Sequence, residues 1–260
     1  MSFLIDPYRF NSCPADALAF IAAAGITNTT QKQAICTLVS DLQTYGIWTK
    51  MKAIYPFVGG TATTHKYNLK NPQDTNAAFR LVFNGGWTHS STGATPNGTN
   101  AYGDTFYTPS TSGQLNSAHL SYYSRSTTGA TLALMGCNNG GAPIYRHVLG
   151  ISATGIALNT TTTTSYAPAS SAGFHMVKRE ISTEIKLVYN GVVASPVSMT
   201  TEGRPSVAMV IGARRSGLSI TNFSALQCAF ASIGDGLTDT EAANFYTAVQ
   251  AYQTTLGRQV

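Results

Sequence analysis

The stretch that decides the fold is QCAFASIGDGLTDTE, residues 227–241, followed by a helical pattern that reaches Gly257. An apolar strand stops at a glycine turn, and an amphipathic helix starts at once. Thr238 and Glu241 have the spacing of a capping box, in which each side chain satisfies the other's exposed backbone N–H. Apolar residues then recur at helical spacing, which predicts one buried stripe over residues 239–256, and Gly257 lies where a left-handed C-cap is expected. The stripe consists of Ala242, Phe245, Val249, Tyr252 and Leu256.

Upstream, from residue 47 onward, short apolar segments alternate with turns rich in Gly, Asn, Pro and Ser. Asn190–Gly191 is a strong signal for a two-residue hairpin. Many short strands with no helices between them predict an antiparallel sandwich or jelly roll. A long loop is expected over 84–100, and a loop or an exposed strand over the threonine run at 159–165. Strands are expected at 51–58, 78–83, 119–125, 131–136, 144–151, 173–181, 184–190, 192–195, 207–215 and 225–233.

The first 46 residues have a different pattern. Pro14 fits the first position of a helix that runs to about residue 24, and a second helix starts near residues 27–30. Gly25 and Gly46 end them. The sequence therefore predicts a helical cap over 14–46, followed by a β-sandwich over 47–257 that includes the C-terminal helix.

The composition narrows the classes of function. Charged residues make up 10% of the chain, against about 25% in an average soluble protein. Such a surface costs less to desolvate, so it suits packing against proteins or hydrogen bonding to sugars. The net charge of +5 is scattered rather than clustered, so nucleic-acid binding is not expected. No apolar run approaches the roughly 20 residues of a membrane span, and the chain is expected to be soluble, uncleaved and made in a cytoplasm.

The four cysteines, Cys13, Cys36, Cys137 and Cys228, are far apart and form no C-x-x-C pair. A zinc site is therefore not expected. Their even number permits two disulfides. Buried free thiols are favoured, because Cys36 and Cys228 both lie in apolar runs.

Residues 84–104 concentrate the side chains that bind sugars, namely an aromatic face to stack on and Asn, Asp and His to hydrogen-bond. The alternative is that the tryptophan fills the sandwich and that the Asn and Gly residues turn the chain. Calcium is a second possibility, with oxygens from Asn97, Asn100, Asp104 and Asp235, although this loop has only one carboxylate. Turn formation is the default interpretation, and no metal or cofactor is expected. The candidate glycan residues are Trp87, His89, Asn97, Asn100, Tyr102 and Asp104.

No motif points to catalysis. A glycosidase needs two carboxylates about 5–5.5 Å or 6.5–9.5 Å apart, and the E-x-D-x-x-E strand motif of glucanases is absent. Glu180 and Glu184 flank Ser182–Thr183 and are expected at a hairpin tip. There is no G-x-S-x-G elbow, and His119 and His147 lie in strand-like runs where a structural role is favoured. The chain is therefore expected not to be an enzyme.

Longer segments resemble a known family. The ending over 227–257 resembles the end of the laminin-G-like, concanavalin A-like β-sandwich. The segments at 46–69, 78–105, 120–125 and 234–260 resemble virion proteins of tailed phages of Bacteroidetes bacteria with a concanavalin A-like lectin/glucanase domain. The resemblance implies a mainly β fold, a concanavalin A-like antiparallel jelly roll with two N-terminal helices and one C-terminal helix.

It also implies a function. The expected role is a phage virion structural protein, a fibre or decoration subunit on capsid or tail that is assembled in the bacterial host cytoplasm. Expected partners are other virion proteins, further copies in a dimer or trimer, and a host surface glycan. A lectin module not tied to a particle and a polysaccharide depolymerase remain alternatives. The opening resembles short segments of other phage structural proteins, which implies an attachment arm over 1–13 that uses Phe3, Leu4, Ile5, Tyr8 and Phe10.

Overall fold

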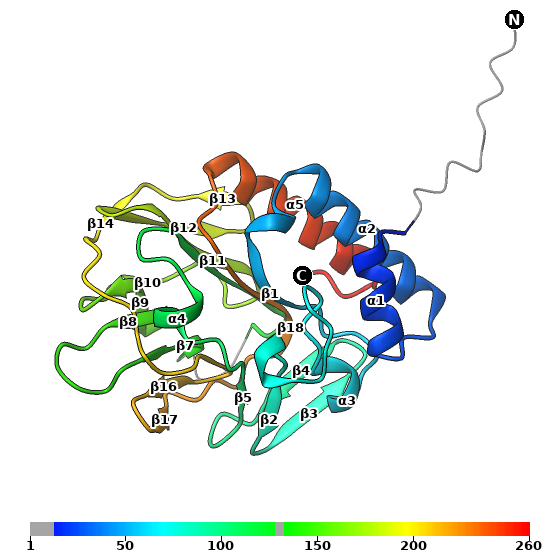
Figure 1. Cartoon of the computed structure of the whole chain (residues 1–260), viewed down its shortest axis with the longest axis horizontal. Helices are drawn as coiled ribbons and strands as arrows, with labels where there is room; N and C mark the ends of the chain where they lie inside the picture. The colour runs from blue at the N-terminus through cyan, green and yellow to red at the C-terminus, as the bar shows by residue number, and fades with distance from the viewer. Residues whose placement is uncertain (1–12, 128–132) are drawn as a thin grey trace, which may run out of the picture.

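A computed structural model of the chain describes residues 13–127 and 133–260. The arm residues Phe3, Leu4, Ile5, Tyr8 and Phe10 lie outside the described residues. Two antiparallel sheets face each other, and helices cover the outer face of one of them (Figure 1). The predicted mainly β sandwich with two N-terminal helices and one C-terminal helix is confirmed.

Three longer helices form the covering layer: α1 (Ala15–Ala23), α2 (Thr29–Thr44) and α5 (Asp239–Thr255). Two single-turn helices, α3 (Ala62–His65) and α4 (Pro109–Ser112), lie in connections. Short 3₁₀ turns occur at η1 (Trp48–Lys50) and η2 (Asn76–Ala78).

The helix-covered sheet has the order β13-β12-β11-β6-β18-β4-β3, with β1 beside β18 and β14 beside β12. Every described pair in it is antiparallel. Its strands are β1 (Met51–Tyr55), β3 (Trp87–Ser90), β4 (Gly93–Pro96), β6 (Ala118–Ser124), β11 (Gly173–Ile181), β12 (Glu184–Tyr189), β13 (Val192–Val193), β14 (Val197–Ser198) and β18 (Cys228–Gly234).

The second sheet, here called the outer sheet, has the order β10-β9-β8-β7-β15-β5-β2. Strand β16 pairs with β17 and, in parallel, with β7. The strands are β2 (Val82–Asn84), β5 (Tyr102–Asp104), β7 (Ala133–Asn138), β8 (Arg146–Gly150), β9 (Ser152–Thr160), β10 (Thr164–Tyr166), β15 (Val210–Ile211), β16 (Arg214–Ser216) and β17 (Ser219–Thr221).

Two apolar layers hold these parts together. Phe20, Ile35 and Phe245 belong to the layer between the helices and the first sheet. Leu120 and Leu149 belong to the layer between the two sheets. Strand alternation explains how one sheet serves both layers, because successive side chains point to opposite faces.

The local signals near the C-terminus and at the hairpin are confirmed. Thr238 caps α5 by accepting from the backbone N–H of Glu241, and the Glu241 carboxylate accepts from the backbone N–H of Thr238 at 2.7 Å. Asn190 and Gly191 have φ of 46° and 80°, the left-handed pair that a two-residue hairpin requires. Helix α2 starts at Thr29, within the expected range of 27–30, and Asn28 caps it. Pro14 caps α1 rather than opening it.

Several predicted strands are wrong in part. Over 78–83 the chain first makes η2 and then places Phe79 at φ 57°, so only Val82 and Phe83 enter a strand. The expected loop at 84–100 contains the hairpin β3–β4. The expected strand at 207–215 is reduced to β15 and the start of β16. The threonine run contains both alternatives, because β9 ends at Thr160 and β10 starts at Thr164.

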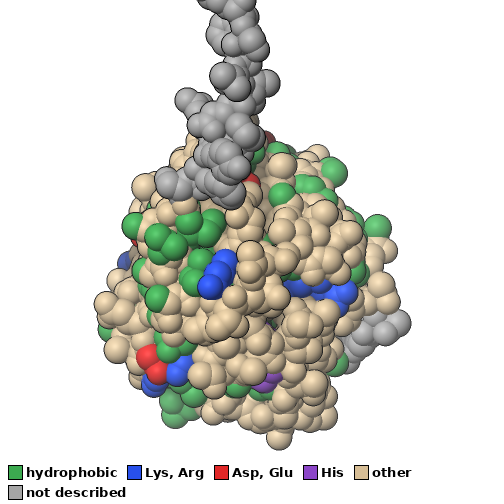
Figure 2. Space-filling view, turned by 90° about the vertical axis from the view of Figure 1, so that its right-hand side faces the viewer, with side chains coloured by type: hydrophobic (Ala, Val, Ile, Leu, Met, Phe, Trp, Pro, Cys, Tyr) green, Lys and Arg blue, Asp and Glu red, His purple; other side chains and the backbone are tan. Residues whose placement is uncertain are grey.

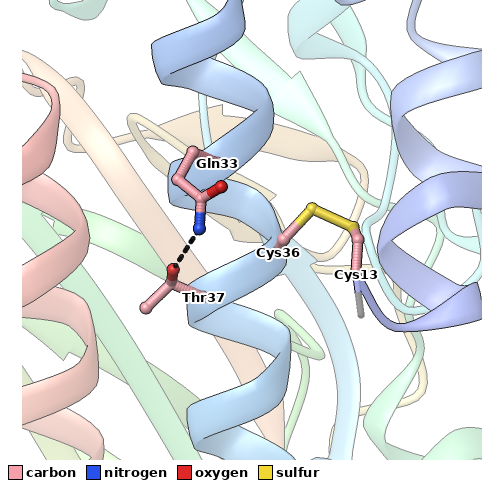
Figure 3. The surroundings of a disulfide bond; sticks show 4 residues. All are labelled: Cys13, Gln33, Cys36 and Thr37. Carbon is pink, nitrogen blue, oxygen red and sulfur yellow. Dashed lines mark hydrogen bonds between the residues drawn. A yellow bond between two sulfur atoms is a disulfide. The ribbon is translucent and has the colours of Figure 1, made fainter. Parts of the chain in front are cut away.

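The expectation that Cys36 is a buried free thiol is wrong. Cys36 forms a disulfide with Cys13, which joins the chain just before α1 to the middle of α2 (Figure 3). An apolar run cannot show this pairing, because it arises from the way that the two helices lie side by side. Cys137 and Cys228 are buried free thiols, as expected.

The packed structure continues past Gly257. Arg258 is 1% exposed, and its guanidinium donates to the carbonyls of Pro56 at 2.7 Å, Phe57 at 2.7 Å and Ala229 at 2.8 Å. The last turn of the chain is thereby joined to β1 and β18. None of the described helices is long and apolar enough to cross a membrane.

Candidate functional site

The predicted glycan residues lie along one open edge of the sandwich. Trp87 and His89 are on β3, the last strand of the helix-covered sheet, and Tyr102 and Asp104 are on β5, next to the last strand of the outer sheet. We call this region the Trp87 edge and define its aromatic cluster as His65, Phe83, Trp87 and His89. The structure therefore brings most of the predicted residues to one side of the molecule.

The aromatic rings of this cluster pack against one another. The Phe83 ring lies 5.3 Å from Trp87 and 4.5 Å from His89, with T-shaped geometry in both pairs. Trp87 is half-buried, and a side-chain atom added at Gly212 would lie 3.0 Å from its ring. The indole Nε1 is buried with no partner among the described residues. Trp87 thus fills the space between the sheet edges, as the alternative interpretation predicted.

A histidine pair completes the Trp87 edge. Nδ1 of His65 lies 2.9 Å from Nδ1 of His89, and Nε2 of His65 accepts from the backbone N–H of Gly60 at 3.2 Å. His65 must therefore carry its proton on Nδ1 and donate it to His89. Burial, together with His89 and Arg258, lowers the pKa of His65 to about 3. Burial also lowers the pKa of His89, so both rings are neutral at pH 7.

The remaining predicted residues are occupied by internal contacts. Asn97 Oδ1 accepts from the backbone N–H groups of Thr99, Asn100 and Ala101, each at 3.1 Å. Its Nδ2 donates to Asn100 Oδ1 at 2.7 Å. This is the turn-forming role that was the default.

The acidic residues considered for calcium have cationic partners. Asp104 accepts from Arg215, and Asp235 pairs with Lys52 at 3.0 Å. Over the described ranges, no three or more His, Cys, Asp or Glu side chains gather as a metal site would require. Tyr102 is half-buried opposite Asn84.

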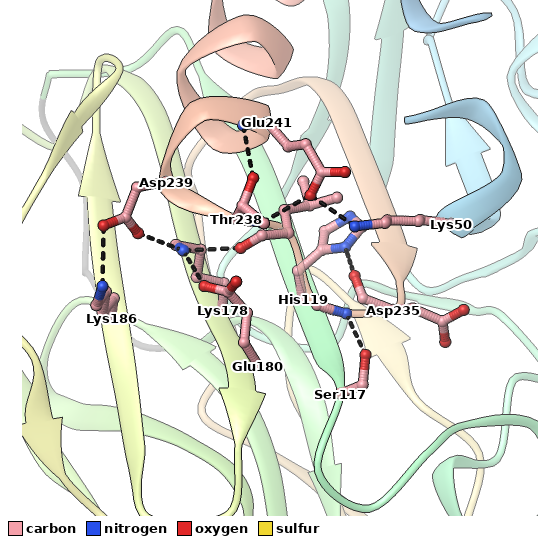
Figure 4. Close-up of polar contacts among 12 residues, drawn as sticks. Lys50, Ser117, His119, Lys178, Glu180, Lys186, Asp235, Thr238, Asp239 and Glu241 are labelled. Atoms are coloured by element: carbon pink, nitrogen blue, oxygen red, sulfur yellow. Dashed lines mark hydrogen bonds and ion pairs between the residues drawn. The ribbon is translucent and has the colours of Figure 1, made fainter. Parts of the chain in front are cut away.

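A cluster of charged groups lies where α5 meets the helix-covered sheet (Figure 4). Lys178 is 1% exposed and donates to Glu180 at 2.5 Å, to Asp239 at 2.6 Å and to the Leu237 carbonyl at 2.7 Å. Side-chain hydrogen bonds from Lys178 and Lys186 lower the pKa of Asp239. These contacts satisfy a buried ammonium and anchor the start of α5, so the cluster has a structural role.

His119, in the same region, contacts a serine as the base of a nucleophile–base pair would, but the pair is closed off from solvent. Its Nε2 lies 3.1 Å from Ser232 Oγ, and its Nδ1 lies 2.6 Å from the backbone oxygen of Asp235. Figure 4 shows the Asp235 carboxylate pointing away from the imidazole. His119 and Ser232 are fully buried, and burial lowers the pKa of His119 to about 4. A substrate has no route to this pair, and the expected structural role of His119 is confirmed.

The opposite open edge of the sandwich holds a groove that the sequence did not indicate. It lies between β10 of the outer sheet and β12–β13 of the helix-covered sheet and encloses about 580 Å³. We call it the Tyr189 groove. The only signal for it was the hairpin at Asn190–Gly191, whose Val192 is 72% exposed. The groove is lined by Ser165, Tyr166, Ala167, Leu187, Tyr189, Asn190, Val192 and Ala194.

No protein-family model matches the chain, and no curated protein matches it. Among solved structures, a mutant Trypanosoma rangeli sialidase with trans-sialidase activity has a TM-score of 0.49 and 10% identity, over 86% of this chain and 39% of that one. The Ruminococcus gnavus IT-sialidase CBM40 bound to alpha2,3 sialyllactose has a TM-score of 0.38 and 19% identity, over 50% of this chain and 82% of that one. The Botulinum neurotoxin serotype D binding domain has a TM-score of 0.44 and 9% identity, over 78% and 51%. These likenesses are too weak to carry an argument, so the assignment as a β-sandwich depends on the sheets of this chain alone.

Proposed function

We propose that this chain is a phage virion structural protein, a fibre or decoration subunit on the capsid or tail. Its sandwich would be displayed outward, and its first 13 residues would attach it to the particle. Other virion proteins and further copies of the chain would be its partners. In this proposal the subunit performs no catalysis.

The observation that carries this proposal is the Cys13–Cys36 disulfide. Disulfides persist at virion and cell surfaces and in secreted proteins, and they are rare in a reducing cytoplasm. A subunit that is assembled in the host cytoplasm and released by lysis would form this bond on the particle. The bond joins the last residue of the proposed arm to α2, where it would fix the point at which the arm leaves the helical cap.

The surface supports the same proposal. Figure 2 shows one face on which small, separate blue, red and green patches lie in a mostly tan surface. A surface of uncharged polar groups loses little hydration energy when it packs against a neighbouring subunit. This property suits a protein that is built into a larger assembly.

Purified phage particles test the proposal directly. Mass spectrometry of gradient-purified particles should detect the chain, with Cys13 and Cys36 protected from alkylation unless a reductant is added. A chain lacking residues 1–12 should fold but fail to enter particles. Absence of the chain from particles would contradict the proposal, and incorporation of the truncated chain would contradict the role of the arm.

A second candidate function is carbohydrate binding, either on the particle or as a lectin module not tied to one. The Tyr189 groove favours it, because its volume and its mix of aromatic and polar lining are those of a small-ligand site. A glycan array probed with the purified full chain tests this function. Binding to no glycan on the array would contradict it.

A further inference from the structure

We propose that the Tyr189 groove is the ligand site of the sandwich and that it takes the ring of a neutral sugar. This inference rests on the proposed carbohydrate binding and places it at the opposite edge from the residues that the sequence predicted. Three properties of the groove support it: an aromatic ring held as a platform, a lining without charge, and polar groups at its rim.

Tyr189 is held as a platform. Its hydroxyl donates to the Ala172 carbonyl at 2.9 Å, which fixes the ring at its polar end. The centre of its ring lies 5.2 Å from that of His175, with a tilt of 32°. His175 is fixed in turn by the Tyr166 hydroxyl at 3.0 Å and the Ser171 carbonyl at 3.0 Å. The ring is therefore supported on the His175 side, and its groove side can stack on the C–H face of a sugar without rearrangement.

The groove selects against charge. None of the eight side chains that line it is charged. Successive side chains along β12 point to opposite faces of the sheet: Leu187 belongs to the layer between the sheets and Val188 to the layer under the helices. Charged residues of β12 on the helix face therefore cannot reach the groove. Lys186 therefore points to the helix side, where it pairs with Asp239 at 2.9 Å. A charged ligand would lose its hydration and find no counter-ion here, so the lining complements a neutral ring.

The rim offers hydrogen bonds for sugar hydroxyls. Asn190 Oδ1 accepts from the backbone N–H of Phe174 at 2.8 Å, which fixes the amide in one orientation. Its Nδ2 donates to no acceptor among the described residues, and Asn190 is one of the residues that line the groove, so this N–H group is left for a ligand. Ser165 adds an exposed hydroxyl on the opposite wall. An apolar wall with a few polar groups at fixed positions binds and orients a small ligand.

The test blocks the groove at an exposed position. Val192 is 72% exposed at the rim, so Val192→Trp adds bulk there without disturbing the core. Leu218, at the tip of the distant β16–β17 hairpin, is 100% exposed, and Leu218→Trp is the matched control. The probe is an array of neutral hexose and N-acetylhexosamine oligosaccharides printed beside their sialylated and uronic-acid counterparts. We expect the full chain to bind neutral glycans, Val192→Trp to bind them at least about tenfold more weakly, and Leu218→Trp to bind like the wild type.

A second variant tests the polar rim. Asn190→Asp keeps the left-handed backbone preference and the Oδ1 acceptor for Phe174, but it removes the Nδ2 donor and adds a charge. We expect it to fold and to lose binding to a similar degree. If Val192→Trp and Asn190→Asp still bind neutral glycans like the wild type, or if the wild type binds only acidic glycans, the groove assignment is wrong while carbohydrate binding stands. If the wild type binds no glycan, the proposed carbohydrate binding fails together with the groove.

Discussion

The two open edges of the sandwich contain similar residues and use them differently. At the Trp87 edge, Phe83, Trp87 and His89 pack against one another and close the gap between the sheets. At the Tyr189 groove, the hydroxyls of Tyr166 and Tyr189 are hydrogen-bonded to His175 and to the Ala172 carbonyl, and both residues line a groove of about 580 Å³. An aromatic-rich segment can therefore offer a surface for stacking only where neighbouring side chains do not already cover its rings.

Acid should produce the largest effect, because it acts on both edges. Burial lowers the pKa of all five histidines, to about 3 for His65 and to about 4 for His119, His147 and His175. In the unfolded chain their pKa is near 6.5, so the unfolded state takes up protons first as the pH falls. Stability is therefore complete above about pH 6.5 and is lost as the pH falls toward 4. By pH 5 the loss is on the order of 2 kcal/mol for each fully buried histidine, measured by urea unfolding.

The same change of pH can separate the two edges when amide hydrogen exchange is measured. At the Trp87 edge the two Nδ1 atoms of His65 and His89 lie 2.9 Å apart, and the Nδ1 of His65 already carries a proton. A second proton on the Nδ1 of His89 would place two N–H groups against each other and break this hydrogen bond. His175 at the Tyr189 groove faces a hydroxyl and a carbonyl, which can both accept from a protonated ring. Amide hydrogen exchange at pH 5 should accordingly rise in β3 before β11. Earlier exchange in β11, or a free energy of unfolding that is constant between pH 7 and pH 5, would contradict this account.

Loss of the disulfide should have the next largest effect and should leave the contrast between the edges intact. Cys36→Ser opens a cross-link between residues 23 positions apart, which costs about 3 kcal/mol of stability. The bond joins only the N-terminal helices, so glycan binding by the groove should not change. Reductant should lower the unfolding midpoint of the wild type by the same amount and leave Cys36→Ser unaffected. A wild-type midpoint that ignores reductant would contradict the prediction.

Trp87→Ala compares the edges most directly. Removing a half-buried indole opens a gap between the sheet edges and should lower the free energy of unfolding by about 2–3 kcal/mol. The loss is smaller than for a fully buried tryptophan, because part of the indole is already exposed to water. Binding of neutral glycans should stay at the wild-type level, since the groove lies at the other edge. Calorimetry and the array measure the two quantities on one preparation. If the Trp87→Ala chain folds but no longer binds neutral glycans, the binding site lies at residues 84–104 and not in the groove.

Local signals predicted the elements that depend on neighbours in sequence. The Thr238–Glu241 capping box and the Asn190–Gly191 hairpin need only a few residues, and both occur as expected. The failures depend on distant parts of the chain. Cys13 meets Cys36 only after two helices pack, and Phe79 adopts a left-handed conformation that its sequence does not suggest.

The proposed site was harder to predict than the fold for the same reason. Trp87 was a reasonable candidate, but its contact with Phe83 and Gly212 depends on how two sheets meet. The Tyr189 groove is built from β10, which ends at Tyr166, and from β12–β13, which begin at Glu184. No motif records that its two walls face each other. The residue types in segment 84–104 could suggest sugar binding. The position of a groove could be found only once the pairing of the sheet edges was known.

Tyr189→Phe should have the smallest effect and tests why the two edges differ. The change removes the hydroxyl that donates to Ala172 and keeps the ring, so it should cost about 1 kcal/mol of stability. Tyr102→Phe is the matched change at the Trp87 edge, where the tyrosine hydroxyl has no hydrogen bond within the described part of the chain. Tyr102→Phe should therefore lower the free energy of unfolding by less than Tyr189→Phe does. Glycan binding by Tyr189→Phe should fall by no more than about threefold, because stacking uses the ring. Binding that collapses in Tyr189→Phe would mean that the hydroxyl contacts the ligand itself, and the ring would then not be the platform that distinguishes this edge.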